Sequence, residues 1–332
     1  MATTFHLVAT LVVVALVFDF LNGFHDSANA IATIVITRTL TPLQAVLLAG
    51  FANFIGYFTF GVAVATMIGK GVVHIDHVTL PLLFASLIGA ILWNVVTWLL
   101  GLPTSSSHAL IGGLVGAGIA SVGPEVIIIT GVLKIFAFIF VAPLLGMAGA
   151  IIVTLLTMWL FRKSIPKKAA AICKRLQLVS ATLYSVGHGT NDAQKTMGII
   201  ALALYTGGFI PSFHIDEWVV LACYSAISLG TMFGGWRIVK TMGTRITKIR
   251  AMEGFCAETS SALVLIGTAH AGIPVSTTHV IAGAIMGVGT VEHAASVRWI
   301  TARKILWAWI LTIPASSFFA AVAYFVLSPF LT

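Results

Sequence analysis

Two stretches of the sequence resemble each other closely: GLPTSSSHALIGGLVGAG at Gly101–Gly118 and GIPVSTTHVIAGAIMGVG at Gly272–Gly289. Aligned at an offset of 171 residues, they share seven identities in 18 positions, where unrelated segments would share about one. Each copy places hydroxyl side chains and a histidine between a proline and a glycine-rich apolar run. The chain therefore contains an internal duplication, and the residues shared by the two copies include a serine and a histidine in an otherwise apolar sequence.

The composition places the chain in a membrane. Hydrophobic residues make up 59% of its 332 residues and charged residues only 8%, whereas soluble domains carry about 25% charged residues. A soluble fold is therefore excluded, and we expect an all-α polytopic protein of the plasma membrane, starting near Phe5 without a removable signal peptide. Because one crossing needs about 20 residues, the apolar stretches predict about eight spans and up to twelve, with Val126–Phe161 long enough for two.

The basic residues are concentrated in two segments. Arg162–Arg175 holds six and Trp236–Arg250 holds five of the 18 lysines and arginines. Basic loops of membrane proteins face the cytoplasm, so both segments are predicted there, and the acidic pair Asp216–Glu217 between them is predicted outside. This placement accounts for the net charge of +8 without a nucleic-acid partner.

A second pair of related motifs precedes the first pair. NGFHDSAN at Asn22–Asn29 aligns with HGTNDAQK at His188–Lys195 at an offset of 166, with the Gly and Asp in common. Two elements in the same order indicate two homologous membrane repeats, 1–161 and 178–332, joined by a basic cytoplasmic linker, 162–177, in one integrated transport domain. Similarity alone does not show whether the second repeat is inverted relative to the first.

The aspartates of the shorter motifs, Asp26 and Asp192, lie within apolar segments. A charged carboxylate at the bilayer centre costs several kcal/mol unless it faces a polar cavity. Gly23 and Gly189 are predicted to break the helices there and expose backbone carbonyls. Carboxylate and amide oxygens suit a hard cation such as Na⁺, and a protonatable Asp suits H⁺; the alternative is a polar network that only holds helices together. The expected coupling residues are Asn22, Asp26, Asn191, Asp192 and Glu258.

The hydroxyl runs follow Pro103 and Pro274, which fit the first turn of a helix. Hydroxyls and unpaired N–H groups at a helix N-terminus attract anions, and short segments that begin at a proline suit re-entrant hairpins. The alternative is helix capping and interhelical hydrogen bonding alone. His108 and His279 are predicted to brace the hairpins or to relay a proton. The expected anion ligands are Asp26, Asn29, Ser105, Ser106, Ser107, Asn191, Asp192, Ser276, Thr277 and Thr278.

These motifs resemble the inorganic phosphate transporter (PiT) family of secondary transporters. The resemblance is carried by NGFHDSANAIAT, GTNDAQKTMGI, GFCAE and the two proline–hydroxyl–histidine stretches, and it covers nearly the whole chain. It implies two inverted repeats, two re-entrant hairpins, and binding roles for Asp26, Asn29, Asn191, Asp192, Glu258 and the hydroxyl runs. The sequence departs from many relatives by having His25 in place of Asn and, compared with eukaryotic relatives, Asn53 in place of Glu.

The predicted function is symport of inorganic phosphate with Na⁺ or H⁺ by alternating access, with no cofactor and no enzymatic activity. A phosphate beside two bare carboxylates would be repelled, so cation binding must precede or accompany the anion. A sulfate permease on the same scaffold remains an alternative. An intramembrane Ser–His hydrolase is disfavoured because adjacent helical residues such as Ser107 and His108 do not face each other. The expected surroundings are the lipid bilayer, and the sequence is compatible with a homo-oligomer.

Overall fold

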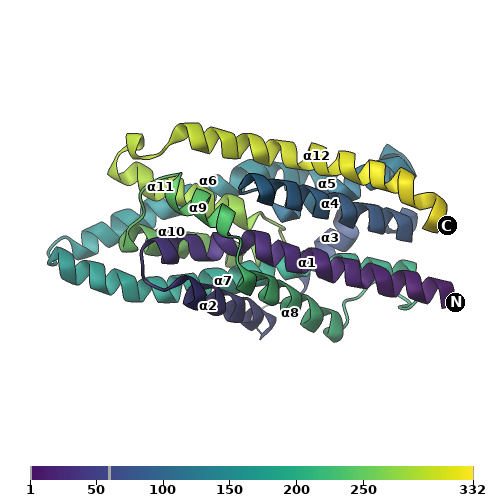
Figure 1. Ribbon diagram of the computed structural model, residues 1–332, viewed down its shortest axis with the longest axis horizontal. Helices are drawn as coiled ribbons and strands as arrows, with labels where there is room; N and C mark the ends of the chain where they lie inside the picture. Colours follow the sequence, from purple (N-terminus) through teal and green to yellow (C-terminus); the bar gives the residue numbers. More distant parts are fainter. Residues whose placement is uncertain (1, 59–60, 332) are drawn as a thin grey trace.

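A computed structural model describes residues 2–58 and 61–331 as helices joined by short loops (Figure 1). The first half holds α1 (Ala2–Ile36), α2 (Pro42–Ile55), α3 (Ala63–Gly71), α4 (Leu80–Leu100), α5 (Ser106–Ser121) and α6 (Ile129–Phe161). The second half holds α7 (Pro166–Thr206), α8 (Glu217–Phe233), α9 (Trp236–Thr244), α10 (Ala251–His270), α11 (Thr277–Glu292) and α12 (Trp299–Leu331). Short 3₁₀ turns are η1 (Gly56–Phe58), η2 (Ile75–His77), η3 (Pro124–Val126) and η4 (Ala294–Ser296). The described part of the chain contains no β-strand, which confirms the all-α prediction.

The two halves repeat the same six-helix pattern. The third helices have 9 residues each, the fifth 16 each and the sixth 33 each. In Figure 1, α1 and α7 run in opposite directions along the molecule, as do α6 and α12. Both termini lie at one end, and the α6–α7 connection lies at the other (Figure 1). The repeats are therefore inverted, as the family resemblance implied.

The predicted helix breaks at Gly23 and Gly189 are wrong, because α1 and α7 are continuous. Both glycines serve close packing instead: a Cβ on Gly23 would overlap the carbonyl of Ile227, and one on Gly189 would overlap the backbone of Asn53. The helices are instead bent between the second and third helix of each repeat. The segments of α2 and α3 meet at 83°, and those of α8 and α9 at 71°. Each repeat thus has one broken helix, but outside the Asp motif.

Other boundaries also differ from the sequence prediction. Within the stretch Val126–Phe161, residues 129–161 form one helix, α6, rather than two legs, since Pro143 is accommodated inside it. Only residues 162–165 separate α6 from α7, so most of the predicted linker 162–177 is the first part of α7. By length and composition, four helices within residues 2–58 and 61–331 can cross a membrane, or up to six if each bent pair is one span, compared with the expected number of about eight. The helices α7 and α10 fall outside this set and carry many buried polar side chains.

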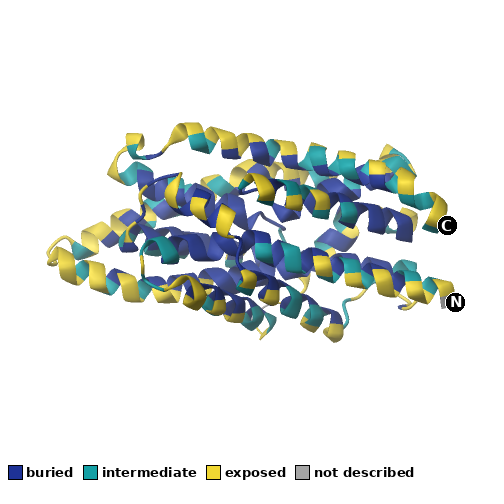
Figure 2. Ribbon diagram, viewed as in Figure 1, coloured by how far each residue is buried: buried dark blue, intermediate teal, exposed yellow. Residues whose placement is uncertain are grey.

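The hairpins follow the prediction. Each of α5 and α11 has 16 residues, about 24 Å, which is too short to cross a hydrocarbon core of about 30 Å. Both helices begin near the middle of the molecule, where buried residues gather (Figure 2). Helices α6 and α12 expose large apolar side chains such as Leu144 and Phe318, which suits contact with lipid. The fold thus directs two helix N-termini and the polar faces of α1 and α7 to a buried centre.

Candidate functional site

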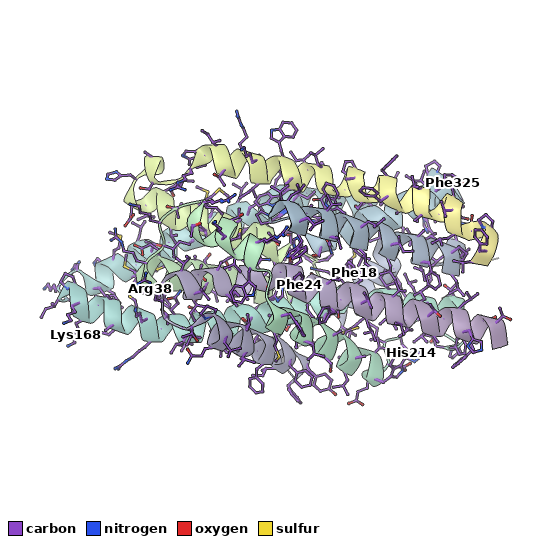
Figure 3. The ribbon with its side chains drawn as sticks, viewed as in Figure 1. Phe18, Phe24, Arg38, Lys168, His214 and Phe325 are labelled. Atoms are coloured by element: carbon purple, nitrogen blue, oxygen red, sulfur yellow. The ribbon has the colours of Figure 1, made fainter. Side chains whose placement is uncertain are left out.

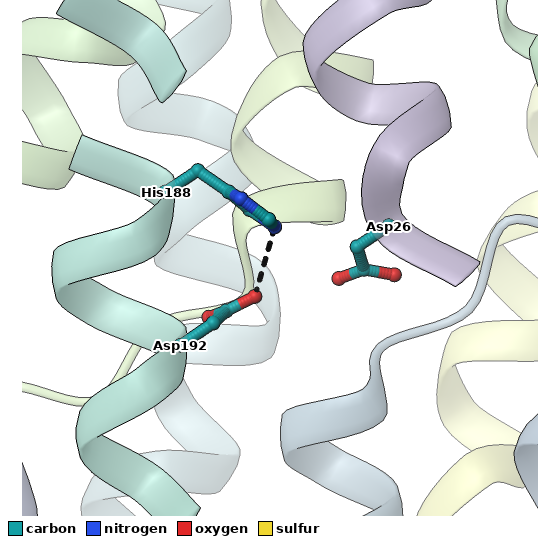
Figure 4. A group of neighbouring side chains, drawn as sticks. All are labelled: Asp26, His188 and Asp192. Carbon is teal, nitrogen blue, oxygen red and sulfur yellow. Dashed lines mark ion pairs between the residues drawn. The ribbon is translucent and has the colours of Figure 1, made fainter. Parts of the chain in front are cut away.

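The two motif aspartates face each other at this centre. Asp26 on α1 and Asp192 on α7 are buried, and the hydroxyl of Thr277 on α11 lies 3.3 Å from Oδ2 of the first and 3.1 Å from Oδ2 of the second. Ligand atoms of Asp26, Asp192 and His188 lie within 4.8 Å of one another (Figure 4). Such a group has the donor set of a small cation site.

The two carboxylates have different counter-charges. Asp26 has the Nδ1 of His25 at 2.8 Å from Oδ1 and the Thr278 hydroxyl at 3.4 Å from Oδ2. Asp192 has the Nε2 of His188 at 3.3 Å from Oδ2 and also pairs with the ammonium of Lys195. The lysine ammonium places a positive charge directly beside Asp192, whereas an imidazole is charged only when protonated. The Asp192 side is therefore neutralised by the protein, and the Asp26 side is not.

The hydroxyl runs begin the short helices α5 and α11. Ser105 accepts a hydrogen bond from the N–H of His108 at 3.2 Å, and Ser276 accepts one from the N–H of His279 at 3.3 Å. These two serines are therefore N-caps, which agrees with the alternative interpretation that the hydroxyl runs cap helices. Both serine hydroxyls act as acceptors in these bonds, which leaves their own hydrogens available at the N-termini of α5 and α11. Ser106 has no side-chain partner among the described residues.

The tips of the two hairpins touch. The Thr278 hydroxyl donates to the carbonyl of Thr104 at 3.1 Å. Behind the tips, the rings of His108 and His279 lie 4.8 Å apart, and His279 stacks on Trp309 with centroids 3.9 Å apart. These contacts support the bracing interpretation of both histidines. The hydroxyl runs from both repeats thus surround one place rather than two.

Each repeat reaches across to the hairpin of the other. The amide of Asn29 on α1 donates to the Thr278 hydroxyl at 2.8 Å. The ammonium of Lys195 on α7 donates to the Ser107 hydroxyl and to the carbonyl of Val275, the latter at 2.9 Å. The structure therefore brings together six of the predicted residues: Asp26, Asn29, Ser107, Asp192, Thr277 and Thr278.

Three other predicted residues lie apart from these contacts. Glu258 on α10 accepts hydrogen bonds from Thr33 at 2.5 Å, Ser180 at 2.6 Å and Gln177 at 3.0 Å. Thr33 is seven residues beyond Asp26, about 10 Å along α1. Buried acceptor oxygens of Asn22 and Asn191 have no hydrogen-bond partner within residues 2–58 and 61–331. Glu258 therefore forms a second polar site rather than part of the first.

Sequence reasoning left Lys195, His25 and His188 outside the predicted set. His25 adjoins Asp26 and reaches the Thr97 hydroxyl at 3.2 Å, and His188 lies one turn before Asp192. The i to i+3 spacing of Asp192 and Lys195 also signals an ion pair on one helix face. These local spacings could have identified all three residues without a structure.

An inverted pair of membrane repeats around a buried site of acids, hydroxyls and one ammonium is the arrangement of a membrane transporter. Residues 22–320 match the phosphate transporter family, and the chain belongs to that family. It is 52% identical over 322 residues to a probable low-affinity inorganic phosphate transporter of Rhizobium meliloti, covering 97% of this chain and 96% of that protein. It is 43% identical to the protein of the same description from Bacillus subtilis, covering 96% of each.

The fold also matches a solved structure, described as the sodium-dependent phosphate transporter, with a TM-score of 0.86 and 24% identity. That match covers 98% of this chain and 100% of the other. The protein is thus an inorganic phosphate transporter and a multi-pass protein of the plasma membrane, not an enzyme.

Proposed function

We propose that this transporter moves inorganic phosphate together with Na⁺ or H⁺ by alternating access. One observation carries the proposal: Thr277, in the hydroxyl run of the second repeat, lies within hydrogen-bond reach of both Asp26 and Asp192. The residues predicted to hold the anion therefore touch the residues predicted to hold the cation. The solved relative that shares the fold is described as sodium-dependent.

Electrostatics supply the coupling. Two like unit charges about 4 Å apart repel by about 4 kcal/mol at an effective dielectric constant of about 20. Lys195 offsets the charge of Asp192, whereas Asp26 has only a histidine and hydroxyls around it. A mobile cation or proton at Asp26 removes the remaining repulsion, so phosphate and cation bind together. Glu258, held by three neutral donors, is proposed as a further coupling site along α1.

Alternating access follows from the inverted repeats. The carboxylates and hairpin tips are buried, so this conformation closes the site from both ends. Exchange of the two repeats' conformations would open one end and close the other. A pocket of about 120 Å³ lies between α1 and α4 and is lined by Leu21, Phe24, His25, Asn94, Val95 and Trp98.

The distribution of charge orients the protein. Figure 3 shows Arg38 and Lys168 toward one end of the molecule and His214, near the acidic pair Asp216–Glu217, toward the other. The basic end is proposed as cytoplasmic. Both termini lie at the opposite end (Figure 1), which is then outside. The two repeats are proposed to move as parts of one transport domain around the central site.

Uptake of ³²P-phosphate into proteoliposomes under an imposed Na⁺ or pH gradient tests the proposal. Asp26→Asn and Asp192→Asn are each expected to lower uptake at least tenfold. Glu125→Gln, which alters an exposed carboxylate in η3, beyond the end of α5 that is remote from Ser107, is the matched control. Unlabelled sulfate added as a competitor tests the alternative function: a sulfate permease would lose ³²P-phosphate uptake when sulfate is present in excess. Uptake that ignores both gradients, or that survives both Asp substitutions, contradicts the proposed symport.

A further inference from the structure

The two repeats differ at one place in the site. The offset of 166 that aligns Asp26 with Asp192 also aligns Asn29 with Lys195. In the structure each of these residues contacts the opposite hairpin: Asn29 donates to Thr278, and Lys195 donates to the equivalent hydroxyl, Ser107. The same position therefore carries a neutral amide in the first repeat and an ammonium in the second.

The ammonium of Lys195 occupies a place built for a cation. Its three partners are a carboxylate oxygen of Asp192, the hydroxyl of Ser107 and the backbone carbonyl of Val275. The side chain is 1% exposed. Carboxylate, hydroxyl and carbonyl oxygens are the ligands that hard metal cations take in proteins. In this structure the ammonium of Lys195 occupies the position that such a cation would have among these three oxygens.

The first repeat has the same three ligand types without the lysine. The hairpin offset of 171 relates Val275 to Thr104 and Ser107 to Thr278. The Thr278 hydroxyl lies 3.4 Å from Oδ2 of Asp26 and 3.1 Å from the carbonyl of Thr104. No lysine or arginine pairs with Asp26 in the described part of the chain. The buried Oδ1 of Asn29 lacks any donor there.

We infer that Lys195 is a fixed cation for Asp192, so that of the two motif aspartates only Asp26 takes a mobile cation in each transport cycle. The inference rests on the proposed symport and specifies its ion requirement. The charges at positions 29 and 195 then set the number of cations that move with each phosphate. Because the lysine is tethered to α7, it cannot cross the membrane with the phosphate, so its ammonium stands in for a mobile cation at Asp192, although it still faces the anion through Ser107.

The coupling ratio tests the inference directly. Purified full-length protein is placed in proteoliposomes loaded with phosphate, and the cation gradient at which net ³²P flux is zero gives the number of cations per phosphate. Lys195→Asn, which installs the residue of the first repeat, is expected to raise the ratio by one. Asn29→Lys is expected to lower it by one. Lys195→Arg keeps the charge and is expected to keep the ratio of the wild type.

The outcomes separate this inference from the proposed function. A wild type without gradient-driven flux overturns the symport itself. A coupled wild type whose ratio stays the same in Lys195→Asn overturns the role of Lys195. If Lys195→Asn does not yield a monodisperse protein, Asn29→Lys is used as the test. An unchanged coupling ratio in that variant likewise overturns the role assigned to Lys195. If a variant folds but does not transport, ²²Na⁺ bound or protons taken up per protein replace the flux ratio.

Discussion

The imidazole rings of His108 and His279 lie 4.8 Å apart although 171 residues separate them in the chain. They are equivalent residues of the two repeats, and equivalent side chains can meet only near the axis that relates the repeats. The axis therefore passes between the hairpin tips. A site on this axis receives one hydroxyl run and one aspartate from each repeat, which explains why both motifs are duplicated.

Trp309 should hold this arrangement in place. Its ring stacks on His279, and its indole N–H donates to the carbonyl of Pro103 at 3.0 Å, so it ties α12 to both hairpins. Trp309→Phe should lower the free energy of unfolding by about 1 kcal/mol for the lost hydrogen bond. Trp309→Ala should cost about 3–5 kcal/mol. Thermal unfolding in detergent measures both, with Trp307→Phe at an exposed position of the same helix as control. Equal stability of the Trp309 variants and the control would contradict the role.

Thr277 is expected to control transport through its hydroxyl alone. Thr277→Val keeps the shape but removes the group that lies between the two carboxylates. Phosphate uptake should fall at least tenfold, while protein yield and monodispersity stay near those of the wild type. Thr277→Ser restores the hydroxyl and should recover most of the uptake. A Val variant that transports like the Ser variant would show that the contact is incidental.

The duplication, the hairpin tips and the two motif aspartates could all be predicted from the sequence, because polar residues in an apolar chain stand out and repeat. The continuity of α1 and α7 could not. Gly23 and Gly189 suit both a helix break and close packing, and only the neighbouring Ile227 and Asn53 decide between them. The surroundings of Glu258 could not be predicted from the sequence either, because its hydrogen-bond partners come from α1 and α7, which are distant in the chain.

Glu258 offers a prediction that separates stability from transport. Glu258→Ala leaves three buried donors, those of Thr33, Gln177 and Ser180, without their acceptor. Each unsatisfied buried group costs about 1–3 kcal/mol, so the melting temperature in detergent should fall markedly. Glu258→Gln keeps one acceptor oxygen and should lose less stability, yet should reduce the cation dependence of uptake. A Gln variant with the cation dependence of the wild type would limit Glu258 to a structural role.

Asp19 is expected to destabilise the fold. It is fully buried, accepts one hydrogen bond from Thr196 at 2.9 Å, and has an Oδ2 atom with no donor in the described chain. One turn along α1, the Oδ1 of Asn22 also lacks a donor. Asp19→Asn replaces a buried carboxyl group with an amide that supplies N–H groups, so it should raise the melting temperature, whereas Asp19→Ala should not. A lower melting temperature for the Asn variant than for Ala would contradict this account.

The packing role assigned to Gly189 can be tested against a glycine in open space. A Cβ at Gly189 would overlap the backbone of Asn53, and the helices α7 and α2 would have to separate. Gly267 on α10 has no atom within 4 Å of the corresponding position. Gly267→Ala should therefore stabilise its helix by up to about 1 kcal/mol, whereas Gly189→Ala should lower the melting temperature. It should also lower uptake, because Asn53 holds His188 at 3.1 Å and His188 contacts Asp192. Had Gly189 instead marked a break in the helix, alanine there would be tolerated as well as it is at Gly267.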